Sequence, residues 1–147
     1  MKIYLAGAIA KMGAEQKTSL GTIAQTLRNK GLEVFNPIEH KIEKGDEMDN
    51  KEWARKVFEM DKAHLDEADV VVLCYNGVES VGQNGTCWEC GYSYAKQKPV
   101  IIVTMNPASV SSLMLAFGSH SCVKGVRGLR RYDFKKLRQN SFTTILG

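Results

Sequence analysis

Short apolar runs alternate along the chain with longer stretches in which apolar residues recur every three or four positions. The short runs are typical of buried strands, and they span Lys2–Ala6, Leu32–Phe35, Val70–Cys74 and Val100–Val103. The longer stretches have the spacing of amphipathic helices, and they span Ala14–Lys30, Lys51–Glu67, Thr86–Gln97, Ser109–Phe117 and Arg127–Gln139. Strands that alternate with helices indicate βαβ units and a mostly parallel sheet.

This pattern predicts an α/β protein with an open, mostly parallel five-stranded sheet and helices on both faces, in a flavodoxin-like or Rossmann-like arrangement. The 147 residues are close to the commonest size of one domain, so a single domain is expected to cover residues 1–147. In open sheets of this kind, ligands bind beyond the carboxyl ends of the strands. That rule points to three loops, Gly7–Gly13, Asn36–Asn50 and Asn76–Gly85.

Composition and known motifs argue against several classes of protein. Hydrophobic residues make up 44% and charged residues 24% of the chain, as in ordinary globular proteins. The apolar runs fall far short of the roughly 20 residues of a membrane helix, and the N-terminus lacks a signal-peptide pattern. We therefore expect a cytoplasmic protein with no membrane partner. Neither Gly-x-x-x-x-Gly-Lys-Ser/Thr nor Gly-x-Gly-x-x-Gly occurs, which argues against a nucleoside-triphosphate or dinucleotide enzyme.

Basic residues are concentrated near the end of the chain, in a protein of net charge +4. Between Lys124 and Arg138, seven basic residues accompany one acid, Asp133. We interpret this segment as the solvated face of a helix, and attraction of an anionic substrate is the alternative. No nucleic-acid-binding motif accompanies the charge, so a nucleic acid polymer is not expected as a partner.

The four cysteines are expected to be reduced thiols in the cytoplasm. Cys87 and Cys90 form a C-x-x-C pattern, for which a redox motif is one interpretation. A zinc site would need a second pair or nearby histidines at matching spacing, and the sequence has neither. We therefore expect no bound metal.

Glu89 lies in the segment Gly85–Tyr92, which follows a buried strand and a glycine-bearing loop and opens a predicted helix. Thr86 and Glu89 have the spacing of a capping box, in which two side chains satisfy backbone N–H groups at a helix start. Alternatively, a carboxylate held ionised at the positive end of a helix, beside the ligand-binding edge, can act as a nucleophile. Both interpretations fit the sequence.

Asp61 is a second candidate carboxylate, on the predicted helix Lys51–Glu67. It follows Trp53 by eight residues, a little over two helical turns, so the two side chains lie near one face of the helix. A single aspartate in such a charged helix usually faces solvent. The functional alternative is that Asp61 and Glu89 converge across one pocket as an acid and a nucleophile.

Four separated pieces of the sequence resemble the nucleoside 2-deoxyribosyltransferase family. They occur in the family's order between Lys2 and about Phe134, and they are Ile3–Gly7, Trp53–Asp61, Gly85–Tyr92 and Leu113–Leu115. The resemblance implies an enzyme that cleaves the N-glycosidic bond of a 2'-deoxynucleoside and transfers the deoxyribose by double displacement, as retaining glycosidases do. It implies a small-molecule deoxynucleoside and a free nucleobase as partners, and no cofactor.

The resemblance also implies roles for individual residues. Glu89 is the expected nucleophile, Asp61 the acid that protonates the departing base, and Tyr4 the residue that holds Glu89 in position. Substrate contacts are expected from Gly7, His40, Trp53, Gln83, Ser112 and Met114. In the family, the stretch that matches Leu113–Leu115 reaches the active site of a neighbouring subunit, so we expect a homo-oligomer with shared active sites.

Two positions depart from the family pattern, both at the end of the sugar that carries the 5'-hydroxyl. Gln83 stands where the family usually has an aspartate, and Ser112 stands where it usually has an asparagine. Loss of the aspartate removes a negative charge that would repel a phosphate. A phosphate would instead be bound by Ser112, by backbone amides near Gly7 and by Lys11. A related branch, the 2'-deoxynucleoside 5'-phosphate N-hydrolases, resembles this chain in its serine. The alternatives to the favoured transferase are therefore a 5'-monophosphate N-glycosidase and a non-catalytic nucleotide-binding module.

Overall fold

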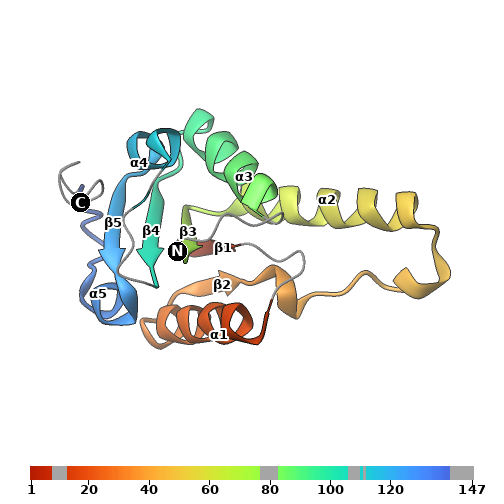
Figure 1. Cartoon of the computed structure of the whole chain (residues 1–147), viewed down its shortest axis with the longest axis horizontal. Helices are drawn as coiled ribbons and strands as arrows, with labels where there is room; N and C mark the ends of the chain where they lie inside the picture. Colours follow the sequence, from red (N-terminus) through yellow and green to blue (C-terminus); the bar gives the residue numbers. More distant parts are fainter. Residues whose placement is uncertain (8–12, 77–82, 106–109, 111, 140–147) are drawn as a thin grey trace.

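The computed structural model describes residues 1–7, 13–76, 83–105, 110 and 112–139. Within these ranges, five parallel strands form one sheet in the order β2-β1-β3-β4-β5 (Figure 1). The strands are β1 (Lys2–Ala6), β2 (Glu33–Phe35), β3 (Val70–Tyr75), β4 (Val100–Thr104) and β5 (Ser121–Lys124). The predicted α/β fold with an open, parallel, five-stranded sheet is confirmed.

Helices cover both faces of the sheet, as predicted. They are α1 (Ala14–Asn29), α2 (Asn50–Glu67), α3 (Gln83–Ala95), α4 (Leu113–Gly118) and α5 (Gly125–Arg131), with the one-turn 3-10 helices η1 (Pro37–Glu39) and η2 (Gly45–Glu47). α1 and α5 share a hydrophobic cluster with one face of the sheet, and α2, α3 and α4 share a second cluster with the other face (Figure 1). None of the helices in the described ranges is both long and apolar enough to cross a membrane.

The two-residue period of the strands divides the core between the two faces. In β1, Ile3 and Leu5 belong to the cluster with α1, whereas Tyr4 and Ala6 belong to the cluster with α2 and α3. All four side chains are at most 1% exposed. Full burial of a large aliphatic side chain stabilises a fold by about 1.5–3 kcal/mol. Tyr4 differs from the other three because it also places a hydroxyl in this apolar layer.

Two local features fix the start of α2 and the end of α1. The Asp49 carboxylate caps α2 by accepting a hydrogen bond from the Glu52 backbone N–H at 2.8 Å. α1 is followed by Gly31, which has a φ of +81°, a conformation that glycine adopts most easily. The Gly31 N–H donates to the Arg28 carbonyl at 2.9 Å. The chain therefore turns sharply from α1 into β2.

The end of the chain differs from the prediction. The helix predicted over Arg127–Gln139 is wrong in its bounds, because α5 begins at Gly125, where φ is +59°, and ends at Arg131. Beyond α5 the chain folds back on β5, where the Ser121 hydroxyl donates to the Arg138 carbonyl at 2.6 Å. A fifth strand was expected because the predicted sheet has five strands, but the apolar pattern did not locate β5. Only Cys122 and Val123 are apolar in this strand, and Ser121 and Lys124 flank them.

The start of α3 also differs from the prediction. α3 already includes Gln83, three residues before the predicted start at Thr86. Thr86 and Glu89 therefore lie inside the helix, and the capping-box interpretation is wrong. For the same reason, Glu89 lies about two turns from the positive end of the helix rather than on it. The Thr86 hydroxyl oxygen is buried without a hydrogen-bond partner in the described part of the chain.

Candidate active site

Three ionisable side chains come together on the face of the sheet that α2 and α3 cover. Tyr4 comes from β1, Asp61 from α2 and Glu89 from α3. Both carboxylates raise the pKa of Tyr4, and the charge of Asp61 raises the pKa of Glu89, so the three groups share one electrostatic environment. Glu89 and Asp61 therefore lie close enough to interact electrostatically.

Each of these three residues has a buried polar atom that lacks a hydrogen-bond partner among the described residues. The atoms are Tyr4 Oη, Asp61 Oδ1 and Glu89 Oε2. Buried polar groups in proteins are nearly always hydrogen-bonded, because an unpaired one costs about 1–3 kcal/mol. Three such atoms in one cluster point to a site that a ligand completes.

Burial changes the proton affinity of all three groups. It raises the pKa of Glu89 to about 7, while the nearby Tyr4 hydroxyl opposes this shift from outside standard hydrogen-bond geometry. Burial also raises the pKa of Asp61, against the opposing effects of His64 and His40. The pKa of Tyr4 is raised far above its ordinary value, chiefly by burial, so its hydroxyl remains a hydrogen-bond donor at neutral pH.

Two neighbouring carboxyl groups with raised pKa values can divide the roles of acid and nucleophile. Because the two groups interact, their titrations are coupled, and the apparent pKa values belong to the pair. Ionised Glu89 can attack a carbon atom while protonated Asp61 protonates the group that leaves it. This is the division of roles between the two carboxyls of a retaining glycosidase.

An open cavity of about 640 Å³ includes Asp61 in its wall, within the size range of small-molecule sites. The predicted contacts His40 and Trp53 both line it, whereas Tyr4 and Glu89 lie beside Asp61 and are not among its described lining residues. The other described lining residues come from α1, α2 and the connection between β2 and α2, and they are Lys17, Pro37, Ile38, Lys41, Ile42, Gly45, Asp46, Val57 and Met60.

A stack of aromatic rings supports one side of this cavity. Phe35, the last residue of β2, contacts both His40 and His64, with ring centroids 4.5 and 3.8 Å away, and the two histidine rings lie 5.9 Å from each other. Tyr4 stacks on Phe35 at 5.5 Å. The sequence analysis assigned no role to Phe35 or His64. The available signal was the position of His64, which lies three residues after Asp61 and therefore on the same side of α2.

Ser112 and Met114 lie in a second place, an apolar groove of about 470 Å³ between α3 and α4. No described residue lines both this groove and the cavity that includes Asp61. Met114 is 85% exposed, and Ser112 caps α4 by accepting a hydrogen bond from the Leu115 N–H at 3.3 Å. The predicted helix Ser109–Phe117 thus begins later, at Leu113, and residues 109 and 111 lie outside the described ranges.

Gly7 follows β1 at the carboxyl edge of the sheet and has little room around it. A Cβ atom there would lie 2.8 Å from Leu20 Cδ2 and 3.4 Å from Gln16 Nε2. Gln83 begins α3, but its side chain lies outside the described part of the structure, as does all of Lys11. Gly7 therefore permits close packing of α1 on the end of β1.

Gln16 is a polar residue of this edge that the sequence analysis missed. It is 8% exposed, and its Oε1 accepts a hydrogen bond from Asn76 Nδ2 at 2.7 Å. Its Nε2 has no partner within the described ranges. The available signal was its position four residues before Leu20, which places it on the buried side of α1.

No group of three or more His, Cys, Asp or Glu side chains that could hold a metal ion occurs in the part of the chain that the structure describes. All four cysteines are free thiols. Burial raises the pKa of the Cys90 thiol to about 12, so it stays protonated at neutral pH.

Comparison with known proteins gives the family. The chain belongs to the nucleoside 2-deoxyribosyltransferase family, whose sequence model matches residues 3–140. This match confirms the resemblance based on the four separated sequence pieces. No curated protein sequence matches the chain.

Solved structures show the same similarity. A 2-deoxyribosyltransferase from the psychrotolerant bacterium Bacillus psychrosaccharolyticus superposes with a TM-score of 0.81 at 29% identity, over 95% of this chain and 98% of that one. A conserved protein from Enterococcus faecalis (TM-score 0.59, 17% identity, 99% and 94% covered) has the same fold. So does a CMP N-glycosidase from Clostridium botulinum (TM-score 0.57, 19% identity, 89% and 95% covered). The family points to an enzyme that acts on the N-glycosidic bond of nucleosides.

Proposed function

We propose that the protein is a nucleoside 2-deoxyribosyltransferase, which cleaves the N-glycosidic bond of a 2'-deoxynucleoside and transfers the deoxyribose to another free base. The observation that carries the proposal is the cluster of Tyr4, Asp61 and Glu89, each with a buried polar atom that no described residue satisfies. A role in nucleotide salvage in the cytoplasm belongs to the same proposal.

In the first step, a Glu89 carboxylate oxygen bonds to C1' of the sugar as the bond from C1' to the base nitrogen breaks. The electron pair of that bond goes to the base, and protonated Asp61 supplies the proton that neutralises it. The product is a glycosyl ester on Glu89. Tyr4 donates toward the Glu89 carboxylate and so holds it in the attacking position.

In the second step, a nitrogen of the acceptor base attacks C1' and the ester bond to Glu89 breaks. Asp61, now ionised, takes the proton from the acceptor nitrogen, which returns both carboxyls to their starting states. Water in place of the acceptor base would give free deoxyribose. The cavity lined by His40, Trp53 and Asp61 is large enough for a base, and His40 and Asp61 provide polar groups in its wall.

The test is incubation of the protein with deoxyinosine and adenine. The expected products are deoxyadenosine and hypoxanthine, and a covalent deoxyribosyl adduct on Glu89 should be trapped when the acceptor base is left out. Release of hypoxanthine and deoxyribose without deoxyadenosine would favour a hydrolase. Absence of any product from deoxynucleosides and their monophosphates would contradict both enzyme assignments and favour a nucleotide-binding module.

A second candidate function is a 2'-deoxynucleoside 5'-monophosphate N-glycosidase, and a specific observation supports it. The N-cap of α1, Gly13, makes no side-chain cap hydrogen bond, so among the described residues no side chain of the N-cap competes with an anion for the first backbone N–H groups of the helix. Gln16 Nε2, which has no partner among the described residues, lies in the same turn, and Lys17 lines the Asp61 cavity. Glu15, in that turn too, acts against an anion.

The two candidates differ in the substrate that they prefer. We expect free deoxynucleosides to be used at least as well as their 5'-monophosphates. A tenfold higher kcat/KM for the monophosphate corresponds to about 1.4 kcal/mol of added transition-state binding. A preference of that size would reverse the ranking, and loss of the preference in Lys17→Gln would place the phosphate at α1.

Shared active sites in a homo-oligomer complete the proposal. Glu89 is the only charged residue among the described residues of α3, so the exposed face of this helix carries little charge. The exposed large apolar side chains of α3 and α4 are Trp88, Tyr94, Leu113, Met114 and Phe117. A second copy that covers this face would bring its own Ser112 and Met114 toward a site that lacks them. A fully active monomer in sedimentation experiments would contradict this part.

A further inference from the structure

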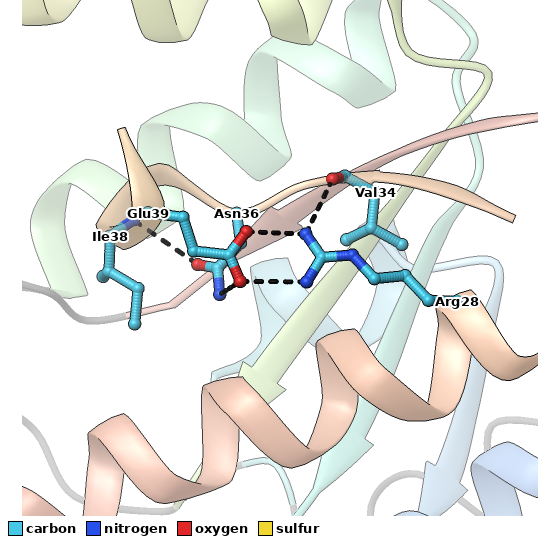
Figure 2. Close-up of polar contacts among 5 residues, drawn as sticks. All are labelled: Arg28, Val34, Asn36, Ile38 and Glu39. Carbon is cyan, nitrogen blue, oxygen red and sulfur yellow. Dashed lines mark hydrogen bonds and ion pairs between the residues drawn. The ribbon is translucent and has the colours of Figure 1, made fainter. Parts of the chain in front are cut away.

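A polar network ties α1 to the segment that follows β2 (Figure 2). The Arg28 guanidinium donates to both carboxylate oxygens of Glu39, at 2.9 and 2.6 Å. The same guanidinium donates to the Val34 carbonyl at 3.2 Å. One side chain of α1 thus binds both the middle of β2 and the last residue of η1.

Asn36 continues this network inside the segment. It is 1% exposed, its Oδ1 accepts from the Ile38 N–H at 3.4 Å and its Nδ2 donates to Glu39 at 3.5 Å (Figure 2). Pro37 restricts the backbone at the first position of η1. The backbone from Asn36 to His40 therefore has few conformations left.

The same short segment forms a wall of the Asp61 cavity. Pro37, Ile38 and His40 line the cavity, although Glu39, between them, turns to Arg28. The His40 ring stacks on Phe35 at 4.5 Å, and the His64 ring, which also stacks on Phe35, lies 5.9 Å from the His40 ring. A shift of the segment would therefore move the cavity wall and the His40 ring together.

We propose that Arg28 and Glu39 are positioning residues that set the wall formed by Pro37, Ile38 and His40, and through it the choice of nucleobase. The proposal rests on the proposed function, in which the base occupies this cavity. The side chains of the pair are 37% and 41% exposed, so the pair adds little to global stability. Its bidentate geometry fixes the orientation of Glu39 relative to α1, and a lysine at position 28 would not reproduce that geometry.

The first test is structural and needs no activity. The chain has three histidines, so the imidazole C–H signals of His40, His64 and His120 can be followed separately by NMR. Ring currents of Phe35 shift the signals of rings stacked on it. In Arg28→Lys and Glu39→Gln, the His40 signals should move toward those of an unstacked imidazole, while the His120 signals stay in place.

The second test is kinetic. In Arg28→Lys and Glu39→Gln, the KM for the acceptor base should rise about tenfold with kcat nearly unchanged, because the wall is displaced while the carboxyls are not. The ratio of kcat/KM for adenine to that for cytosine should change as well. The reversed pair, Arg28→Glu with Glu39→Arg, should recover part of the loss.

Matched controls come from an ion pair of the same two residue types, Arg55 and Glu59 on α2, whose side chains are 63% and 58% exposed. Arg55→Lys and Glu59→Gln should change neither the His40 signals nor base selectivity. Unchanged His40 signals in the Arg28 and Glu39 variants would overturn the proposal, and so would shifted His40 signals with unchanged base selectivity. If the wild type turns over no nucleoside, NMR titration with free adenine and cytosine measures selectivity instead, so failure of the proposed function stays distinct.

Discussion

At the scale of single residues, Glu89 destabilises the fold in order to be reactive. Burial raises its pKa from an ordinary value of 4.5 to about 7. The folded state therefore binds this proton more tightly than the unfolded state does. Below pH 4.5 the carboxyl is protonated in both states and costs no stability. As the pH rises from 4.5 to about 7, the folded state loses stability relative to the unfolded state, and above about pH 7 this loss has reached its full size. Such losses are common at functional sites.

Replacement of the carboxyl by a neutral amide tests this account. Glu89→Gln should raise the free energy of unfolding by up to about 3 kcal/mol at about pH 8, and by almost nothing at about pH 4. Urea unfolding at the two pH values measures the difference. Glu59→Gln, on the exposed side of α2, is the control and should show no such dependence. An equal effect of Glu89→Gln at both pH values would show that the carboxyl is not strained by burial.

The same titration should appear in catalysis. Glu89 must be ionised to attack C1' and Asp61 must be protonated to release the base, so kcat/KM should have a bell-shaped pH profile. One limb should fall near pH 7, since burial raises the pKa of Glu89 to about 7. Asp61→Asn should remove the other limb, and Glu89→Ala should abolish turnover in a protein that remains folded. Near-normal turnover by Glu89→Ala would exclude it as the nucleophile.

At the scale of elements, periodicity predicted the layers because burial imposes it. The runs at Lys2–Ala6 and Val70–Cys74 are buried on both faces, so their apolar character is continuous and easy to recognise. β5 was not located because an edge strand of four residues, with Ser121 at its start and Lys124 at its end, has little apolar signal. The network of Arg28 and Glu39 was missed for another reason: it joins residues that only the fold brings together.

The corrected start of α3 has a consequence for Thr86. An N-cap threonine would stabilise the helix, and its loss would cost about 1 kcal/mol. The Thr86 hydroxyl is instead buried and lacks a partner among the described residues, so it carries a desolvation cost. Thr86→Val should therefore leave the free energy of unfolding unchanged or raise it, as measured in urea. A loss of about 1 kcal/mol or more would restore the capping interpretation.

At the scale of the whole molecule, one chain does not assemble the site that the family resemblance implies. Asp61 lines one cavity, and Ser112 and Met114 line another. The sheet separates α1 and α5 from the face that carries both, so the proposed second copy would approach from the side of α3 and α4 (Figure 1). The sequence predicted the donated stretch by resemblance, but its spatial separation from Asp61 follows only from the fold.

Mixing an inactive variant with a weakened one tests whether sites are shared. Glu89→Ala lacks the nucleophile, and Met114→Ala should weaken a neighbour's site by removing an apolar contact with the nucleoside. If Met114 acts across a symmetric interface, a mixed dimer contains one site with both residues intact. Equal mixing after unfolding and refolding should then restore about a quarter of the wild-type activity, since about half of the dimers are mixed and each has one intact site of two. If Met114 acts within its own chain, the mixture should show only the average of the two variants, and the shared-site arrangement would be wrong. Sedimentation of each variant alone must show unchanged assembly, so that recovered activity reports subunit exchange rather than restored association.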